Sequence, residues 1–338
     1  MVRKFQIIFL FIIGLFLSSL DVVAQKKRAQ TSMKFLSVSP AANAAGMSNA
    51  VTALELGSAS VFYNPAAIAN SDSKYDFTGG VVQYIADINY NSASFTYRPS
   101  NRDFGVIGFN VLAVDYGNIL STVVDGSSST GYQDVGTISP SAVAIGVAYA
   151  NAITDQFSVG ANLRYVSEDL GSVNMESDGS GGYLNESFSA NVLALDFGVL
   201  YKTGFKSLNF AMAVQNFSKE ITFDDESAEL PMTFKIGLAM DVLDLTNIDG
   251  STHSLLVSLD ARRPRDYDEQ LVLGLDYGFM NRFNIRGGYA VPSNDEESFS
   301  FGGGIVQPIG KINLAVDYAY TEFGVFGNVN RISFRLDF

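Results

Sequence analysis

Polar and apolar residues alternate without a break over residues 331–338. One set of alternate positions holds Arg331, Ser333, Arg335 and Asp337. The other set holds Ile332, Phe334, Leu336 and Phe338. Because successive side chains of a β-strand point to opposite faces, this pattern predicts a strand with one polar and one apolar face.

The same period of two recurs in segments of about ten residues along most of the chain, as membrane β-barrels require. Between residues 311 and 320, for example, Ile312, Leu314 and Val316 alternate with polar or smaller residues. We predict about fourteen strands, an even number, which is typical of single-chain bacterial barrels. Their ranges are 74–84, 88–98, 104–116, 140–150, 156–167, 187–201, 206–217, 231–242, 252–262, 268–279, 282–291, 298–307, 311–321 and 327–338.

The connections between these strands alternate in length, which indicates a barrel and orients it. One rim has short turns at 100–102, 152–154, 203–205, 280–282 and 308–310, with one longer connection at 243–251. The other rim has connections at 118–139, 168–186, 218–230 and 263–267. Short turns are typical of the periplasmic side and long loops of the extracellular side. A secreted β-sandwich also shows alternation, but this many strands would need two sandwiches and a linker between them. The sequence therefore predicts an all-β fold, a transmembrane antiparallel barrel.

The first 24 residues have the layout of a secretory signal peptide. Arg3 and Lys4 precede an apolar run too short to span a membrane comfortably, and small residues end at Ala24. No later window predicts a transmembrane helix. We divide the chain into a signal peptide (1–24), an N-terminal plug or periplasmic segment (25–73) and an outer-membrane β-barrel (74–338).

Residues 25–73 lack the alternation of the barrel and are predicted to fold into its lumen or across its periplasmic mouth. Residues 33–38 predict one short strand. Asn64 before Pro65 predicts a helical turn with an asparagine cap. Small residues at lumen-facing positions leave room for such a plug: Gly146, Ala148, Gly160, Ala211, Ala213, Gly237, Ala239, Gly302 and Gly304.

Charged residues of both signs also fall on predicted lumen faces. They are Arg164, Lys235, Asp241, Asp260, Arg262, Asp276, Arg286, Asp317, Arg331 and Arg335. Mixed signs favour salt bridges around a plug over an ion filter of one sign. Tyrosines near predicted strand ends suggest an aromatic girdle at the membrane interfaces. These are Tyr84, Tyr90, Tyr97, Tyr165, Tyr201, Tyr277, Tyr289, Tyr318 and Tyr320.

The composition argues against several kinds of chemistry. The chain has no cysteine, which removes thiol catalysis, disulfides and thiolate metal sites. A single histidine, His253, leaves little room for a zinc site or a Ser/His mechanism. The net charge of −13 becomes −14 when Arg3, Lys4 and Asp21 are removed with the signal peptide, which argues against nucleic-acid binding. We expect no catalytic, metal or cofactor site, and the acidic runs 224–226 and 295–297 lack the spacing of a calcium loop.

Several motifs carry a family resemblance. The N-terminal segment contains Met33-x-Phe-Leu36, Ala44-Ala-Gly-Met47 and Ala59-x-x-Phe-Tyr-Asn-Pro-Ala66. Later segments contain Val214-Gln-Asn-Phe217, Arg286-Gly-Gly-Tyr289 and Asp317-Tyr-Ala-Tyr320. In this order they resemble the PorV/PorQ family, outer-membrane proteins of the Bacteroidetes type IX secretion system with a fold similar to the fatty-acid transporter FadL. The resemblance implies a fourteen-stranded barrel whose plug is formed by residues that include Gly46, Met47, Asn64 and Pro65.

The last strand carries a second resemblance. Its terminal Phe338, with Phe334 and Leu336 on the same face, is similar to the C-terminal strand of bacterial outer-membrane barrels, which their insertion machinery reads. Both resemblances imply a protein that lies in the outer membrane of a Gram-negative bacterium and contacts its lipid.

Two functions remain open at this point. PorV-like proteins take secreted cargo from the translocon by its C-terminal signal domain, which would make the chain a binding partner of translocon subunits or cargo. A FadL-like barrel would instead pass a hydrophobic small molecule through its lumen or a lateral opening. A polar, filled lumen would favour the first function, and a continuous apolar pocket beside the plug would favour the second. An outer-membrane hydrolase is disfavoured because His253 is the only histidine.

Overall fold

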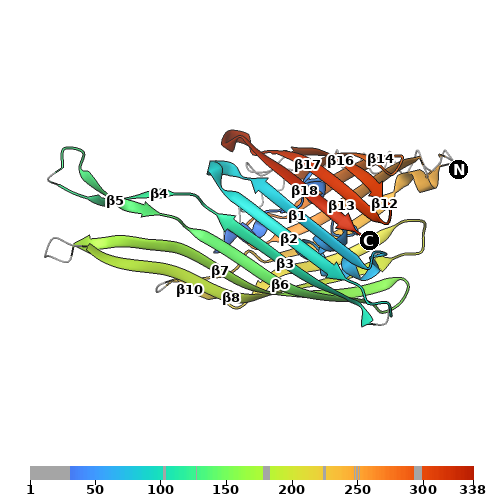
Figure 1. Cartoon of the computed structure of the whole chain (residues 1–338), viewed down its shortest axis with the longest axis horizontal. Helices are drawn as coiled ribbons and strands as arrows, with labels where there is room; N and C mark the ends of the chain where they lie inside the picture. Colours follow the sequence, from blue (N-terminus) through green and yellow to red (C-terminus); the bar gives the residue numbers. More distant parts are fainter. Residues whose placement is uncertain are drawn as a thin grey trace.

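Fourteen antiparallel strands close into one barrel in the computed structural model, which describes residues 31–101, 104–126, 128–177, 183–223, 226–246, 248, 250, 252–292 and 299–338 (Figure 1). The first half of the wall is β1 (Tyr75–Gln83), β2 (Asn89–Tyr97), β3 (Val106–Asp115), β6 (Ser141–Ala152), β7 (Phe157–Ser177), β8 (Tyr183–Lys202) and β9 (Asn209–Ser218). The second half is β12 (Thr233–Asp241), β13 (His253–Pro264), β14 (Gln270–Phe279), β15 (Phe283–Val291), β16 (Phe299–Ile309), β17 (Ile312–Glu322) and β18 (Asn328–Asp337). Strand β1 pairs with β18 and closes the ring. The predicted signal peptide lies outside the described residues.

The predicted fold class is confirmed, and each predicted strand corresponds to one wall strand. The main differences lie at one rim. Strands β7 and β8 are 21 and 20 residues long and stay paired as far as Ser177 and Tyr183, well beyond the predicted ends. Two connections predicted as loops contain hairpins, β4 (Ile119–Val124) with β5 (Tyr132–Ile138) and β10 (Ile221–Phe223) with β11 (Glu226–Ala228).

The two rims of the barrel therefore look different. The outer rim, as we name it, carries β4–β5, β10–β11 and the far ends of β7–β8, and two of these ribbons project well beyond the wall (Figure 1). The inner rim carries the short turns and the C-terminus, where Phe338 exchanges two backbone hydrogen bonds of 2.9 and 3.0 Å with Tyr75. Phe334 and Phe338 point away from the lumen, and Leu336 is half-buried.

The outward face of the wall is apolar, as the alternation predicts. Its exposed side chains include Phe109, Ile145, Val147, Leu163, Leu193, Phe197, Leu273, Ile285, Phe301, Val316 and Ile332. An apolar belt around a closed barrel is the surface that hydrocarbon solvates well, since a closed sheet has no free edge. In the described part of the chain no helix is long and apolar enough to cross a membrane. The girdle prediction is wrong for Tyr84 and Tyr90, which turn inward and pack in a buried cluster with Phe323.

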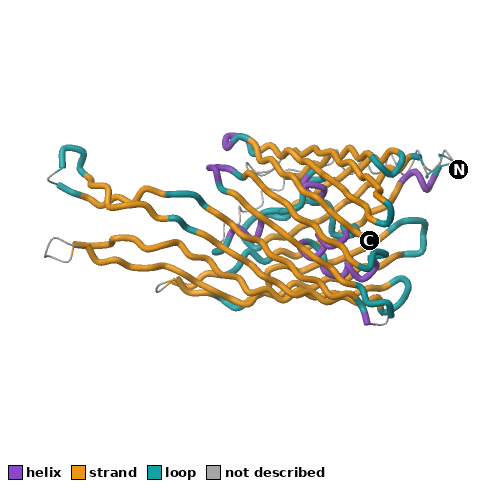
Figure 2. Tube along the Cα trace, in the orientation of Figure 1, coloured by secondary structure: helices purple, strands orange, loops and turns teal. Residues whose placement is uncertain are grey.

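Residues 31–73 run through the lumen from the outer to the inner rim. The segment contains η1 (Lys34–Ser37), α2 (Ala42–Ala45), η2 (Gly57–Phe62) and η3 (Pro65–Asn70), drawn in Figure 2 as short helical turns within the strands. The strand predicted at 33–38 is wrong, because Met33 is left-handed (φ 53°) and η1 follows it. Two residues before Met33, Thr31 forms a single parallel β-bridge with Glu229.

Candidate functional site

The plug fits the wall so closely that glycine is required at several wall positions. A Cβ built on Gly288 of β15 would lie 2.2 Å from the carbonyl carbon of Met47, and one on Gly302 of β16 would lie 3.2 Å from the Cα of Gly46. Gly46 and Met47 are the last two residues of the plug motif Ala44-Ala-Gly-Met47. The plug backbone thus lies directly on the sheet, and no layer of side chains separates them.

Asn64 and Pro65 build the plug end at the inner rim. The Asn64 side chain accepts a hydrogen bond from Ala66 N (3.1 Å), and Pro65 is the first residue of η3, so the predicted cap and turn are present. The Asn64 amide also donates to the carbonyls of Thr52 (2.8 Å) and Val199 (3.2 Å). One side chain therefore joins η3 to the rest of the plug and to strand β8.

Tyr63, next to this cap, joins η2 to the chain before α2. Its hydroxyl lies 2.6 Å from Ser39 Oγ and accepts a hydrogen bond from Ala41 N at 3.1 Å. Burial raises the pKa of Tyr63 to about 12, so the hydroxyl stays protonated at physiological pH. This contact is a permanent internal tie of the plug.

Several of the predicted lumen charges form ion pairs with one another or with neighbouring carboxylates. Arg286 lies between Asp276 (2.7 Å) and Asp317 (2.5 Å), and these three side chains are each no more than 14% exposed. Arg335 binds Asp76 at 2.6 Å near the inner rim. Charges removed from water are costly unless they are paired, so each of these pairs fixes the geometry around it.

A second polar network lies in the lumen nearer the outer rim, on β7, β8 and β9. Arg164 donates to Asp196 (2.6 Å) and to Asn216 (2.5 Å), and Asp196 also accepts from the backbone N–H of Asn216 at 2.8 Å. Asn216 has φ 61°, and the β8–β9 register shifts here, between Leu195 and Phe197. The network therefore fills a bulge in the wall with paired polar groups.

Two further predicted charges, Asp260 and Lys235, contact the plug and line the outer cavity, respectively. Asp260 is fully buried and accepts hydrogen bonds from Thr52 N (3.0 Å) and Thr52 Oγ1 (2.6 Å). Lys235 is 9% exposed and lines the cavity described next. Sequence analysis missed Asp76 and Asp196, although both stand at lumen-facing positions of their strands.

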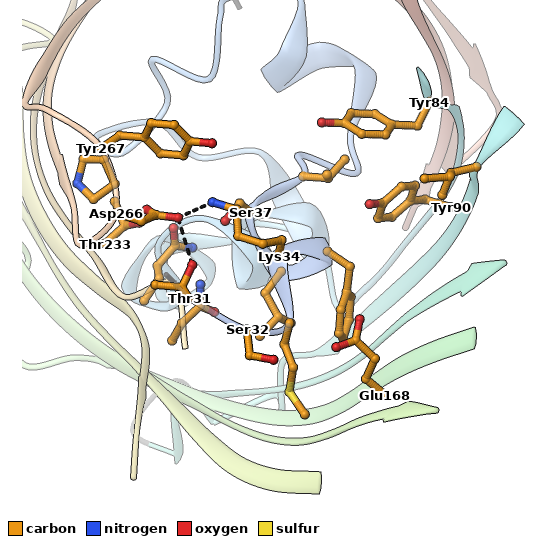
Figure 3. A pocket seen from close by; sticks show the side chains of 18 of the residues that line it. Thr31, Ser32, Lys34, Ser37, Tyr84, Tyr90, Glu168, Thr233, Asp266 and Tyr267 are labelled. Carbon is orange, nitrogen blue, oxygen red and sulfur yellow. Dashed lines mark hydrogen bonds and ion pairs between the residues drawn. The ribbon is translucent and has the colours of Figure 1, made fainter. Parts of the chain in front are cut away.

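A cavity of about 630 Å³ opens at the outer rim above the plug. One wall is aromatic, with Phe35, Tyr84, Tyr90 and Phe323. The opposite wall is polar, where Lys34 forms an ion pair with Asp266 and Thr31 donates to the same carboxylate at 2.9 Å (Figure 3). On the aromatic side a buried carboxylate, Glu168, accepts a hydrogen bond of 2.6 Å from Tyr116. The cavity is amphiphilic, and the plug forms its floor.

A second cavity of about 590 Å³ lies at the inner rim below the plug. Its lining is largely polar and carries both signs of charge, with Glu55, Lys202, Lys206, Asp241, Arg286 and Arg335. No residue lines both cavities. Between them the plug contacts the wall through the glycine positions and buried polar groups, so the plug lies between the two cavities.

Comparison with known proteins gives a family and a fold. The model of the family "Type IX secretion system membrane protein PorP/SprF" matches residues 128–334. No curated protein sequence matches the chain. Among solved structures, the toluene transporter TbuX of Ralstonia pickettii is similar with a TM-score of 0.55 and 16% identity over 88% of this chain and 96% of that one. The toluene transporter TodX of Pseudomonas putida gives 0.55 and 12% over 92% and 98%. A Pseudomonas aeruginosa FadL homologue gives 0.50 and 12% over 92% and 98%. At these identities the structures establish the FadL-like barrel fold.

Proposed function

Because the chain belongs to the PorP/SprF family of type IX secretion system membrane proteins, we propose that it is an outer-membrane barrel that binds other proteins of this secretion route at its outer rim. The long hairpins of that rim face the cell exterior, and the short turns and C-terminus face the periplasm. In this role the outer membrane is that of a Gram-negative bacterium. We assign the chain no catalytic step.

The observation that carries this proposal is the filled lumen. The two cavities share no residue, and the plug between them is held by buried polar contacts such as Asp260 with Thr52. Its backbone lies against wall glycines such as Gly288 and Gly302. A barrel closed in this way is suited to present a rigid outer surface to partners. Moving the plug would expose several charges that are now paired, which is costly.

The finer assignment, a PorV/PorQ-type role in which the barrel receives the C-terminal sorting domain of cargo, rests on the sequence resemblance. The plug motif residues Gly46, Met47, Asn64 and Pro65 support it by building the plug that the resemblance implies. They act as structural residues in this role. Cargo and translocon subunits would meet the outer ribbons first, since these project furthest from the barrel wall (Figure 1).

Affinity capture from native outer membranes tests the proposal. The tagged barrel is solubilised, and captured proteins are identified by mass spectrometry against a second, unrelated barrel tagged in the same way. We expect the large translocon subunit, or proteins that share a C-terminal sorting domain, to be enriched with this chain alone. If the barrel comes back without protein partners and carries bound lipid, the proposal is wrong.

The aromatic wall of the outer cavity favours a second candidate, uptake of a hydrophobic small molecule. Phe35, Tyr84, Tyr90 and Phe323 would contact such a molecule, and two structural neighbours are toluene transporters. One observation argues against uptake. In the described residues, the register shift of the wall below the outer extensions lies at Leu195–Phe197, and buried polar groups fill it. A lateral exit there would need these groups to separate. Mass spectrometry of organic extracts of the purified barrel distinguishes the candidates, since a transporter would carry a defined apolar ligand in stoichiometric amount.

A further inference from the structure

Strand β4 (Ile119–Val124) of the outer ribbon has an uncovered edge. It pairs with β5 on one side, from Ile119 opposite Ile138 to Val124 opposite Tyr132. In the described part of the chain no strand pairs with its other edge, and β4 and β5 form a sheet of two strands. The ribbon stands apart from the wall at its far end (Figure 1). A row of unpaired backbone N–H and C=O groups therefore faces solvent along β4.

The edge also lacks the features by which proteins usually protect such strands. Ile119-Leu-Ser-Thr-Val-Val124 contains no charge, no proline and no glycine. Val124 is 93% exposed and Leu120 is 60% exposed, so apolar side chains stand out on it. Native edges are usually shortened, bulged or charged to prevent pairing. The bulge of this hairpin lies opposite Ser121–Thr122, on β5, and leaves the β4 edge regular.

The charge of the outer rim indicates what kind of chain would approach this edge. The connections at this rim are 84–88, 116–140, 168–190, 218–232, 264–269, 292–298 and 322–327. Together they contain 20 Asp and Glu but only 2 Lys and Arg. A concentration of one sign attracts a partner of the opposite sign and speeds its encounter. The apolar edge of β4 therefore belongs to a rim whose connections are strongly acidic.

We propose that the free edge of β4 takes up an extended, lysine- or arginine-rich strand from a partner polypeptide by β-strand addition. This inference rests on the proposed function and names the chemistry of the partner. Backbone hydrogen bonds to the β4 edge supply the attachment, and alternate apolar side chains pack on Leu120 and Val124. The basic residues between them face the acidic rim, which selects the partner.

A synthetic strand provides the first test, with the full-length barrel in detergent or nanodiscs. The probe is a labelled peptide of about twelve residues that alternates valine and lysine. We expect it to slow amide hydrogen exchange of residues 119–124 about tenfold or more, because their free N–H groups become paired. A valine–glutamate peptide should leave the exchange unchanged. A valine–lysine peptide N-methylated at alternate residues keeps its charge but cannot complete the ladder, and it should also leave exchange unchanged. If the three peptides act alike, the proposal is wrong.

A pair of variants separates the edge from general charge attraction. Thr122→Lys with Val124→Lys places two positive charges on β4, whereas Ser128→Lys with Thr130→Lys places two at the tip of the same ribbon. We expect the first pair to weaken binding of the valine–lysine peptide about tenfold relative to the second pair. Equal weakening by both pairs would mean that charge alone attracts the peptide.

The same variants distinguish failure of this inference from failure of the proposed function. If the wild-type barrel captures translocon or cargo proteins from native membranes and the Thr122→Lys/Val124→Lys barrel captures them equally well, the secretion role stands and the β4 edge is not the docking site. If the wild type captures none of them and the peptide still protects residues 119–124, the edge accepts basic strands and the secretion role fails.

Discussion

Gly287 and Gly288 are neighbours on β15, but only Gly288 touches the plug. A Cβ on Gly288 would lie 2.2 Å from the Met47 carbonyl carbon and 2.4 Å from Ser48 N, whereas a Cβ on Gly287 would have nothing within 4 Å. Backbone atoms cannot move aside as a flexible side chain can, so Gly288→Ala should push the plug off the sheet. We expect it to destabilise the barrel by roughly 1–3 kcal/mol, the usual cost of overpacking.

The measurement is the temperature at which the folded barrel loses its characteristic mobility in a semi-native gel. Gly287→Ala is the matched control, with the same change one residue away, and it should stay close to the wild type. If the two variants lose equal thermal stability, the cost of replacing Gly288 comes from the conformation of the strand and not from contact with the plug.

Arg286 is a buried charge whose stability depends on its two carboxylate partners. It lies between Asp276 and Asp317 at 2.7 and 2.5 Å, and removing it alone leaves two carboxylates close together with little solvent. We expect Arg286→Met to cost roughly 3–5 kcal/mol of unfolding free energy, as the loss of one partner from a buried pair does. The triple variant with Asp276→Asn and Asp317→Asn should recover part of this loss, because it removes the unpaired charge as well. Urea unfolding of the three barrels measures both effects, and a single variant as stable as the wild type would contradict the structural role of the cluster.

The alternation in the sequence predicted that such residues face the lumen, but it could not predict their partners. Asp76 and Asp196 bind Arg335 and Arg164 from neighbouring strands, or across the closure of the barrel. These pairings depend on the stagger of adjacent strands, which period-two patterns leave open. Lys34 and Asp266 depend further on the path of the plug, for which the sequence contains no periodic signal.

At the scale of elements, the wall strands were predictable because one face of each meets lipid. This physical boundary imposes an apolar period of two, as in Ile312–Glu322. The β4–β5 hairpin is exposed on both faces, so neither face is required to be apolar and the pattern fades. In the plug, η3 has a side-chain cap from Asn64, whereas η1, α2 and η2 have none. The positions of these three turns therefore follow from contact with the wall and the rest of the plug.

The plug and the wall can be joined covalently to ask whether the plug moves. Ser48 Oγ of the plug and Ser300 Oγ of β16 lie 2.7 Å apart, both buried, in a chain that has no cysteine. We expect Ser48→Cys with Ser300→Cys to form a disulfide in the oxidising envelope, and the locked barrel to capture secretion partners as well as the wild type. Non-reducing gels of protease fragments report the bond, and the two single variants are controls. Partner capture that appears only after reduction would show that function requires plug movement.

At the scale of the whole molecule, the barrel has two chambers, a fixed partition and an outer rim of strongly negative charge. A fourteen-stranded barrel without a plug would be wide enough to leave an aqueous channel. Here residues 31–73 occupy that space from the bridge at Thr31 to the inner rim, and they contact the wall through apolar packing, backbone atoms and buried polar groups. The plug therefore fills the part of the lumen between the outer and the inner cavity.

This organisation predicts the electrical behaviour of the purified protein. In planar bilayers we expect the wild type to show no steady ion current, because the plug packs on the wall between the cavities above and below it. Deleting residues 32–72 should open a channel, since the wall closes through β1 and β18 without the plug. That current should favour cations, because the uncovered outer mouth is acidic. The variant locked by Ser48→Cys and Ser300→Cys should be as silent as the wild type. A steady wild-type current abolished by the lock would mean that the plug opens on its own, and would favour the uptake of small molecules over a role in binding partners.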